Sequence, residues 1–494
     1  MINSAQNLTI LKKLSVLSLL WLMIPFLLFT LTFYKFYLFA ATVFVVWYFF
    51  KNTFMSFFST PIEPCTWNMR YYIPPAIIIA ILFTWLSGVM PPFSSNFDWI
   101  KHFAILNMLT SHSWPPLFTD HDHTYFLRYN LGLYIVPALL GKLTPFMPVR
   151  YWMAFYEIVG LTLACLLMTY TINADHPKGS RLVVKNLLII TIFMGFSGWD
   201  IIGSVLQGKR IDSLTHIEWW FDFISFSSIA TQQFWVPQHG LPGWIGTLLL
   251  FTNHRYKGEL LKESIFILFP LIFFWSPLVL IGILLLFPLY IVEIFKLLKS
   301  PKNLFMSFII LVVIVLPTSI YFNTEIAKMP HHFVWDPLHP TMEIVKRIFL
   351  FLFLEGFIYI SFLLYLIKDN GIRLMLLFMA IALFASTVYE FGYVNDFSLK
   401  VSMPSITLMA FLIAYTFTTH LNSIRHIAAR ILLALAYCVG LFTPFHEIGR
   451  AVTEDFNPFL ITFEEGIWGY EQYFAPIESK PFFIKSIPIH EQHK

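Results

Sequence analysis

An acid, a cation and an imidazole are spaced for chemistry within one short stretch of the chain. Asp98, Lys101 and His102 stand at positions i, i+3 and i+4, a spacing that puts side chains on the same face of a helix. A carboxylate on such a face can take a proton from an attacking hydroxyl, so Asp98 is the candidate base, with His102 as its neighbour. Lys101 is a candidate contact for an anionic substrate. The alternative interpretation is a solvated face on which Asp98 complements the helix dipole.

Further polar residues follow in the same stretch. The run Asp120-His121-Asp122-His123 has side chains that can ligate a divalent cation, although its spacing matches no specific metal motif. Asp120 and Asp122 are the candidate ligands, and a divalent cation is the one candidate cofactor. Arg128 stands at the entrance to the next apolar run, where its guanidinium can bind a phosphate with two hydrogen bonds. A solvated loop and an arginine that reaches for lipid headgroups are the alternatives.

Two more segments combine aromatic and polar residues. The segment 207–238 and the residues after it contain several tryptophans together with Gln232, Gln233 and His239. Such a mixture suits a groove for an amphiphile, and it equally suits an interfacial aromatic belt. Asp396 and Lys400 follow the apolar run 373–390, where Lys400 is a candidate contact for a lipid phosphate. A loop with an anchoring lysine is the alternative there.

The element that must position Asp98 is an amphipathic helix. Apolar residues recur at helical spacing from 98 to about 109, after Pro91 and Pro92 have ended the preceding helix. Ser94, Ser95 and Asn96 offer an N-cap just ahead of Asp98. We expect this helix to lie on the membrane surface.

Composition places this helix in an all-α, polytopic membrane protein. Hydrophobic residues make up 57% of the 494 and charged residues only 12%, about half the charged fraction of a soluble domain, which is about 25%. Apolar runs recur from about 14–33 to about 427–443, which predicts about 11–14 helices together with amphipathic helices in the outer loops. The run 131–143 is too short to span fully.

The predicted organisation has three parts. Residues 1–70 form two N-terminal transmembrane helices, 71–443 form the main transmembrane domain, and 444–494 form a polar C-terminal tail. One set of short loops is rich in Lys and Arg and is expected in the cytoplasm. The loops 90–130, 207–238 and 323–345, and the tail, are rich in aromatic residues, His and acids. We expect them on the periplasmic side of a cell inner membrane.

Four stretches carry a resemblance to a known family: FDWIKHFAILN with the SHSWPP after it, YNLGLYIVPALLGKL, FWVPQHGLPGWIGTLLL and GYVNDFSLKVSMPSITLM. Through them the chain resembles the integral-membrane glycosyltransferases of the GT-C class over roughly 70 to 440. In that class an acidic residue of the first large outer loop is taken as the catalytic base, and Asp98 occupies that place. Two features depart from the class: two helices precede the fold, and Asp98-Trp99 stands where the class has two acids.

The resemblance implies transfer of a sugar from a polyprenyl-phosphate donor to a glycan, lipid or protein acceptor of the cell envelope. Membrane lipid is then a partner and nucleic acid is not, because the net charge of +4 is small and spread in short clusters. A transporter or lipid flippase is the main alternative, and it requires Glu157 and Glu355 to face a common central cavity. A polymerase or ligase of surface polysaccharide and a noncatalytic scaffold are the others.

Overall fold

The computed structural model describes residues 2–59, 69–120, 123–173, 181–212, 215–221, 223–326, 329–335, 341–419, 424–454 and 472–485. Within them the chain is mostly helical, as expected for a protein that must satisfy its backbone hydrogen bonds inside a lipid bilayer. Eight helices of these residues are long and apolar enough to cross a membrane: Asn7–Phe33, Phe36–Phe58, Met69–Leu86, Val149–Ile172, Pro301–Asn323, Glu343–Leu366, Asp396–Thr418 and His426–Thr453. These helices indicate a multi-pass membrane protein.

The number of candidate spans is smaller than the number of helices expected, because several apolar runs form short or bent helices. Helix α5 (Ile135–Leu143) has nine residues and is therefore only about 14 Å long, so it is too short to span, as predicted. Helices α7 (Arg181–Met194) and α11 (Ile265–Trp275) are also short. Helices α12 (Pro277–Leu286) and α13 (Leu289–Leu298) form a pair bent by 94°, which makes at most one further span.

The two N-terminal helices are part of the packed core. Helix α1 (Ile2–Phe33) lies against α2 (Phe36–Ser59), α6 (Val149–Ile172) and α11. The Trp21 ring stacks on Tyr156 and Trp275 with centroids 5.1 and 4.6 Å away. The Trp21 indole donates to the Tyr156 carbonyl at 3.2 Å, and the Trp275 indole donates to the Leu22 carbonyl at 2.9 Å.

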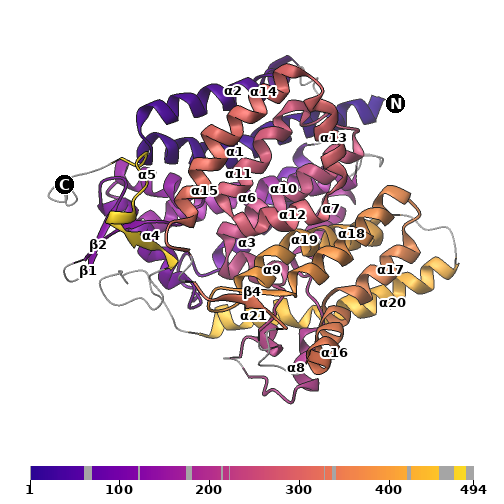
Figure 1. The fold of residues 1–494 in the computed structure, drawn as a ribbon. Coiled ribbons are helices and arrows are strands. Elements are labelled where there is room, and N and C mark those ends of the chain that lie inside the picture. Colours follow the sequence, from indigo (N-terminus) through magenta and orange to yellow (C-terminus); the bar gives the residue numbers. More distant parts are fainter. Residues whose placement is uncertain are drawn as a thin grey trace.

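Two almost fully buried helices run through the middle of the molecule. They are α10 (Pro237–Arg255) and α19 (Asp396–Thr418), and α19 packs closely on α12. A Cβ at Gly282 of α12 would collide with the Val401 carbonyl of α19, so this close approach requires glycine. Around these two helices lie α3 (Met69–Leu86), α14 (Pro301–Ile310), α15 (Leu316–Asn323), α16 (Thr341–Leu352), α17 (Ile358–Leu366), α18 (Asn370–Ser386) and α20 (Ile424–Gly440) (Figure 1).

Segments far apart in sequence meet at one end of the molecule. Strands β1 (Leu117–Asp120), β2 (His123–Leu127) and β5 (Phe474–Pro476) form an antiparallel sheet, and β3 (His331–Phe333) pairs with β4 (Tyr389–Phe391). The segment expected to be a polar tail is therefore folded where it is described. Helix α21 (Phe442–Thr453) opens that segment, and β5 completes the first sheet.

Basic residues gather near the N-terminus. Lys12 lies 3.9 Å from Glu259, the Lys13 ammonium lies over the Phe57 ring, and the Lys302 ammonium lies over the Tyr48 ring. Figure 1 shows the N-terminus and the strands β1 and β2 at opposite ends of the molecule. These three lysines therefore lie far from the first sheet, and the side of the membrane that each set of loops faces stays a prediction.

Candidate active site

A cavity of about 980 Å³ opens where the aromatic and acidic segments meet. Its wall is formed by the N-terminal ends of α4 (Trp99–Ser111) and α19, the 3-10 turn η2 (Ile217–Trp220), α9 (Ile229–Trp235), α21 and the residues before β5. Residues of the predicted outer loops 90–130 and 207–238 therefore line one space together with residues from the end of the chain.

Asp98 and Lys101 form an ion pair on the cavity wall. The Lys101 Nζ lies 2.6 Å from the Asp98 Oδ2, and the side chains are 17% and 25% exposed, respectively. Burial opposes the ionisation of Asp98, but the charge and hydrogen bond of Lys101, with a contribution from Lys400, hold the pKa of this carboxyl below its usual value. Burial likewise lowers the pKa of Lys101, and the charge of Asp98 outweighs it and raises that pKa. Both groups are therefore charged at neutral pH.

The turn before α4 is fixed to α9. Asn96 accepts a hydrogen bond from the Asp98 backbone N–H at 3.0 Å and donates to the Phe234 carbonyl at 2.7 Å. The Trp99 indole donates to the same carbonyl at 2.8 Å. Asn96 is thus the residue of the predicted capping trio that holds the start of the helix. The predicted amphipathic helix exists, but its apolar face is buried inside the protein instead of lying on the membrane surface.

Asp396 and Lys400 form a second ion pair on the same wall. The Lys400 Nζ lies 2.8 Å from the Asp396 Oδ2, with the side chains 11% and 24% exposed. Asn395, at a left-handed backbone position, caps α19 by accepting from the Ser398 N–H, and its amide donates to the Phe223 carbonyl at 2.6 Å. Asp396 and Lys400 therefore lie at the N-terminal end of α19.

His102 points away from the cavity. Its two ring nitrogens lie 2.6 Å from the Tyr134 hydroxyl and 2.9 Å from the Trp235 carbonyl. Burial, followed by the charge of Lys101, lowers the pKa of His102 to about 3 and outweighs the opposing charge of Asp98, so the ring is neutral. His102 thus joins α4 to α5 and α9 and does not share the cavity with Asp98.

Three predicted substrate contacts are buried outside the cavity lining. The Gln232 amide donates to the Ser227 carbonyl at 2.9 Å, and the Gln233 amide donates to the Glu157 carboxylate at 3.1 Å. The His239 ring lies 2.7 Å from the Ser276 hydroxyl. All three side chains are less than 4% exposed. They hold α9 and α10 in place behind the cavity.

Arg128 also lies outside the lining. Its guanidinium donates to the Phe322 carbonyl at 2.9 Å and to the Gln472 carbonyl at 3.2 Å. These bonds tie the end of β2 to α15 and to the residues before β5. Arg128 therefore supports the position of the neighbouring Tyr473, which does line the cavity.

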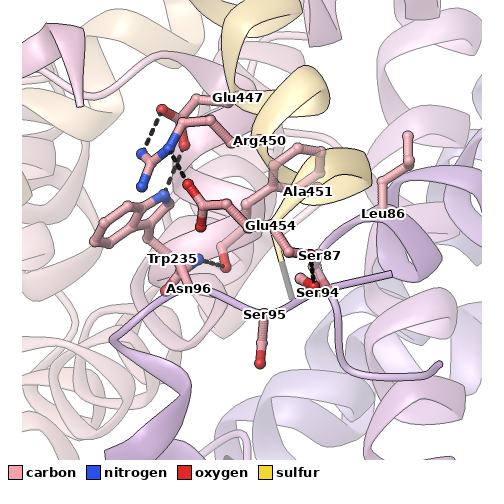
Figure 2. A pocket seen from close by; sticks show the side chains of 11 residues that line it. Leu86, Ser87, Ser94, Ser95, Asn96, Trp235, Glu447, Arg450, Ala451 and Glu454 are labelled. Carbon is pink, nitrogen blue, oxygen red and sulfur yellow. Dashed lines mark hydrogen bonds and ion pairs between the residues drawn. The ribbon is translucent and has the colours of Figure 1, made fainter. Parts of the chain in front are cut away.

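A second part of the wall, formed by η2, α9 and α21, carries a closed network of charges. The His216 Nδ1 lies 2.9 Å from the Glu447 carboxylate, which also accepts from Arg450 at 3.0 Å and from the Trp235 indole at 2.9 Å. Arg450 reaches a second carboxylate, that of Glu454, at 2.9 Å. Figure 2 shows Arg450 between the two carboxylates and beside the Trp235 ring, whose centroid lies 5.5 Å from the guanidinium carbon.

The negative charges around His216 keep its ring protonated at neutral pH. Burial alone would lower the pKa of His216, but the carboxylates of Glu447 and Glu218 outweigh it and raise the pKa to about 10. The Glu218 carboxylate in turn accepts from the Thr231 hydroxyl at 2.6 Å and from the Ser228 N–H at 2.9 Å. This network fixes η2 and α9 against α21 and shapes the aromatic side of the cavity, where Trp219 stacks edge-on to Trp235.

Several residues of the site were not predicted. Tyr129 and Tyr473 line the cavity with ring centroids 5.1 Å apart, and Arg450 comes from the segment expected to be a tail. The one sequence signal for them was the enrichment of aromatic and charged residues in the outer segments.

The predicted metal ligands lie outside the described residues. Asp122 and the side chain of Asp120 are among the parts that the structure leaves undescribed. Elsewhere in the described chain, no group of three or more His, Cys, Asp or Glu side chains is arranged to hold a metal ion.

Searches against protein-family models, curated protein sequences and solved structures find no match for this chain. The resemblance to the GT-C class therefore stays a prediction, and the chemistry must be argued from the cavity itself. That chemistry is a carboxylate in contact with a lysine, beside a second such pair, in a cavity that aromatic side chains also line.

Proposed function

We propose that this chain is a membrane glycosyltransferase that moves a sugar from a polyprenyl-phosphate donor to a cell-envelope acceptor. The observation that carries the proposal is the gathering of Asp98, Lys101, Asp396 and Lys400 on one wall of a cavity of about 980 Å³. Such a donor needs a cavity with cations for its phosphate and a carboxylate for the acceptor hydroxyl.

The rim of the cavity supports a lipid-linked substrate. Phe97, Trp219, Tyr393 and Val394 line it and are 65%, 49%, 45% and 62% exposed. Exposed apolar side chains around a charged interior fit an amphiphile whose chain stays in lipid while its headgroup enters. The side of the membrane on which the cavity opens is, in this proposal, the periplasmic side of the inner membrane.

The proposed reaction gives different tasks to the Asp98 carboxylate and to the two lysines. Asp98 takes the proton of the acceptor hydroxyl, whose oxygen attacks the anomeric carbon of the donor sugar. The bond from that carbon to the phosphate oxygen breaks, and polyprenyl phosphate leaves with the electron pair. Lys101 and Lys400 stabilise the charge that develops on the phosphate. Tyr129 and Tyr473 lie beside this wall and are placed to contact the sugar.

The alternative of a transporter has less support. It required Glu157 and Glu355 to face a common central cavity, and neither residue lines the one found here. Glu157 is held by Gln233, and Glu355 accepts from the Trp220 indole at 2.8 Å.

The test is incorporation of a radiolabelled polyprenyl-phosphate sugar into cell-envelope material, in a strain that lacks the native copy. We expect label that depends on the intact protein and is lost with Asp98→Asn. Label that needs the protein but persists with Asp98→Asn would keep the transferase and move the base, with Asp396 as the next candidate. Absence of any protein-dependent label with the donors tried would contradict the proposal.

A further inference from the structure

A second acidic site lies behind the cavity wall. Asp200 begins α8 (Asp200–Leu206), and Glu355 lies in the π-helical turn Phe353–Phe357 of a candidate membrane span. Each side chain is 1% exposed, and the two carboxyl groups are within hydrogen-bonding reach of each other. A Cβ at Gly198 would collide with the Glu355 carboxylate, so glycine at this position leaves room for that side chain.

The partners of the pair are neutral donors. The Asp200 Oδ2 accepts from the Ser197 hydroxyl at 2.7 Å and the Thr443 hydroxyl at 2.8 Å, and the Glu355 Oε1 accepts from the Trp220 indole. The Glu355 Oε2 is buried with no hydrogen-bond donor among the described residues. In the same part of the chain, neither carboxyl forms an ion pair with a lysine, arginine or histidine.

When two buried carboxyl groups are in contact without a cation, the ionisation of one strongly disfavours the ionisation of the other. One proton between them removes one charge and supplies the donor that the Glu355 Oε2 lacks. Burial, followed by the negative charge of Glu218, raises the pKa of Asp200 to about 7 against the opposing hydrogen bonds of Ser197 and Thr443.

We propose that Asp200 and Glu355 form a proton-binding site that holds one proton between their carboxyl groups and thereby keeps Trp220 in the cavity wall. Trp220 is the link, because its indole N–H donates to Glu355 while its ring lines the cavity and packs where Gly203 has no Cβ. Loss of the proton puts two negative charges in contact, and their repulsion moves the turn at Glu355 and the ring bonded to it. This inference does not rest on the proposed transferase activity.

Other titratable groups surround the pair on the elements that pack against it. Glu218 of η2 is held by Thr231 and Ser228, and Glu447 of α21 is held by His216 and Arg450. Tyr359 of α17 donates to the Ser197 carbonyl, and Tyr437 of α20 donates to the Ile192 carbonyl. Each of these groups is held by partners of its own, so the proposal assigns the titrating proton to Asp200 and Glu355.

Infrared spectroscopy of the full-length protein in detergent micelles tests the site directly. We expect a carboxylic-acid C=O stretching band at mildly acidic pH that disappears at alkaline pH, and we expect its loss in both Asp200→Asn and Glu355→Gln. Glu157→Gln is the matched control, because Glu157 is also a buried glutamate of a candidate span but lies outside the pair. It must leave the titrating band in place. Size-exclusion chromatography checks that each variant is folded. If Asp200→Asn or Glu355→Gln does not fold, the other variant still tests the site.

Tryptophan fluorescence tests the link to the cavity. The difference in emission between the intact protein and Trp220→Phe is expected to change over the same pH range as the band, and to be constant with pH in Asp200→Asn. A carboxylic-acid band that survives in both acid variants would overturn the proton site. A band that appears only when sodium is replaced by choline would also overturn it, because it would indicate that the pair binds a metal cation. If the Trp220 emission does not change over the pH range in which the band disappears, the coupling to the cavity is overturned.

Discussion

The two walls of the cavity carry similar residue types but hold their charges in different ways. On the wall of α4 and α19, each lysine has one carboxylate, and the paired side chains are 11% to 25% exposed. On the wall of η2, α9 and α21, His216 and Arg450 share Glu447, which is 3% exposed and also accepts from Trp235. The first wall has simple pairs open to the cavity, and the second has a closed network.

This difference indicates which wall binds and reacts with the substrate and which wall supports the structure. An ion pair between solvent-exposed side chains gives little stability, about 0–1 kcal/mol. The pairs of the first wall, at 11% to 25% exposed, lie nearer to that limit than Glu447 does at 3%, so their members can exchange a partner for a ligand at a smaller loss. A buried, many-sided network loses far more when one member is removed, because the remaining charges are left unpaired. The open wall should therefore react and bind, while the closed wall should hold the aromatic side in shape.

The largest effect is expected for the candidate base on the open wall. Asp98→Asn should lower the rate of sugar transfer about 10²–10⁴-fold, the range for loss of a positioned proton acceptor. It should lower the free energy of unfolding less than Glu447→Gln does, because the Asp98 side chain is 25% exposed and that of Glu447 is 3% exposed. Initial rates with a labelled donor and thermal unfolding in detergent measure the two quantities.

Asp396→Asn is the matched control, because Asp396 also begins a helix and also pairs with a lysine of the same wall. We expect it to lower the rate much less than Asp98→Asn. The opposite ranking would transfer the role of base to α19 and contradict the assignment of Asp98.

The next effect concerns the closed wall. Glu447→Gln should destabilise the protein by about 3–5 kcal/mol, because it leaves the buried charges of His216 and Arg450 without their shared carboxylate. The free energy of unfolding in detergent measures this loss. Glu454→Gln is the control, since the Glu454 carboxylate pairs with Arg450 and is 21% exposed, and it should cost about 0–1 kcal/mol. Equal losses for the two variants would mean that the network is not a closed unit.

The closed wall should also contribute less to the free energy of unfolding as the pH rises. His216 has a pKa raised from 6.5 to about 10 in the folded protein. Its contribution to stability is therefore complete below pH 6.5 and is lost as the pH rises through the window up to about 10, at a rate of at most about 1.4 kcal/mol per pH unit. Unfolding measured across this window should show the loss in the intact protein and not in His216→Gln. The same slope in both would assign it to other groups.

Sequence alone predicted the class of fold and part of one wall. Composition and apolar runs indicated a helical multi-pass membrane protein, and the i, i+3 spacing of Asp98 and Lys101 indicated their contact. Spacing placed His102 on that face too, and there it was wrong. Tyr134 and the Trp235 carbonyl, both distant in sequence, draw its ring into the protein.

The rest depends on how the chain returns on itself. Nothing local to Arg450 or Tyr473 indicates that the end of the chain closes the cavity, because this follows from the pairing of β5 with β2. The burial of α4 is also non-local, since its apolar face looks the same whether lipid or protein covers it. The predicted 11–14 helices exceed the eight candidate spans of the described residues for a related reason: a short apolar run fits a buried helix as well as half of a crossing.

The smallest expected effect returns to the open wall and asks whether its second lysine binds the donor. Lys400→Gln should weaken binding of a polyprenyl phosphate about 10–100-fold, equivalent to the roughly 1.5–3 kcal/mol of a hydrogen bond to a charged group. It should not change the unfolding temperature much, because its pair with Asp396 is open to the cavity. Binding is measured with the labelled lipid in detergent micelles.

Lys142→Gln is the control, because Lys142 donates to the His112 carbonyl outside the cavity lining and should leave binding unchanged. If both variants bind the lipid as the intact protein does, the phosphate is held elsewhere, and the open wall keeps only the role of positioning the acceptor.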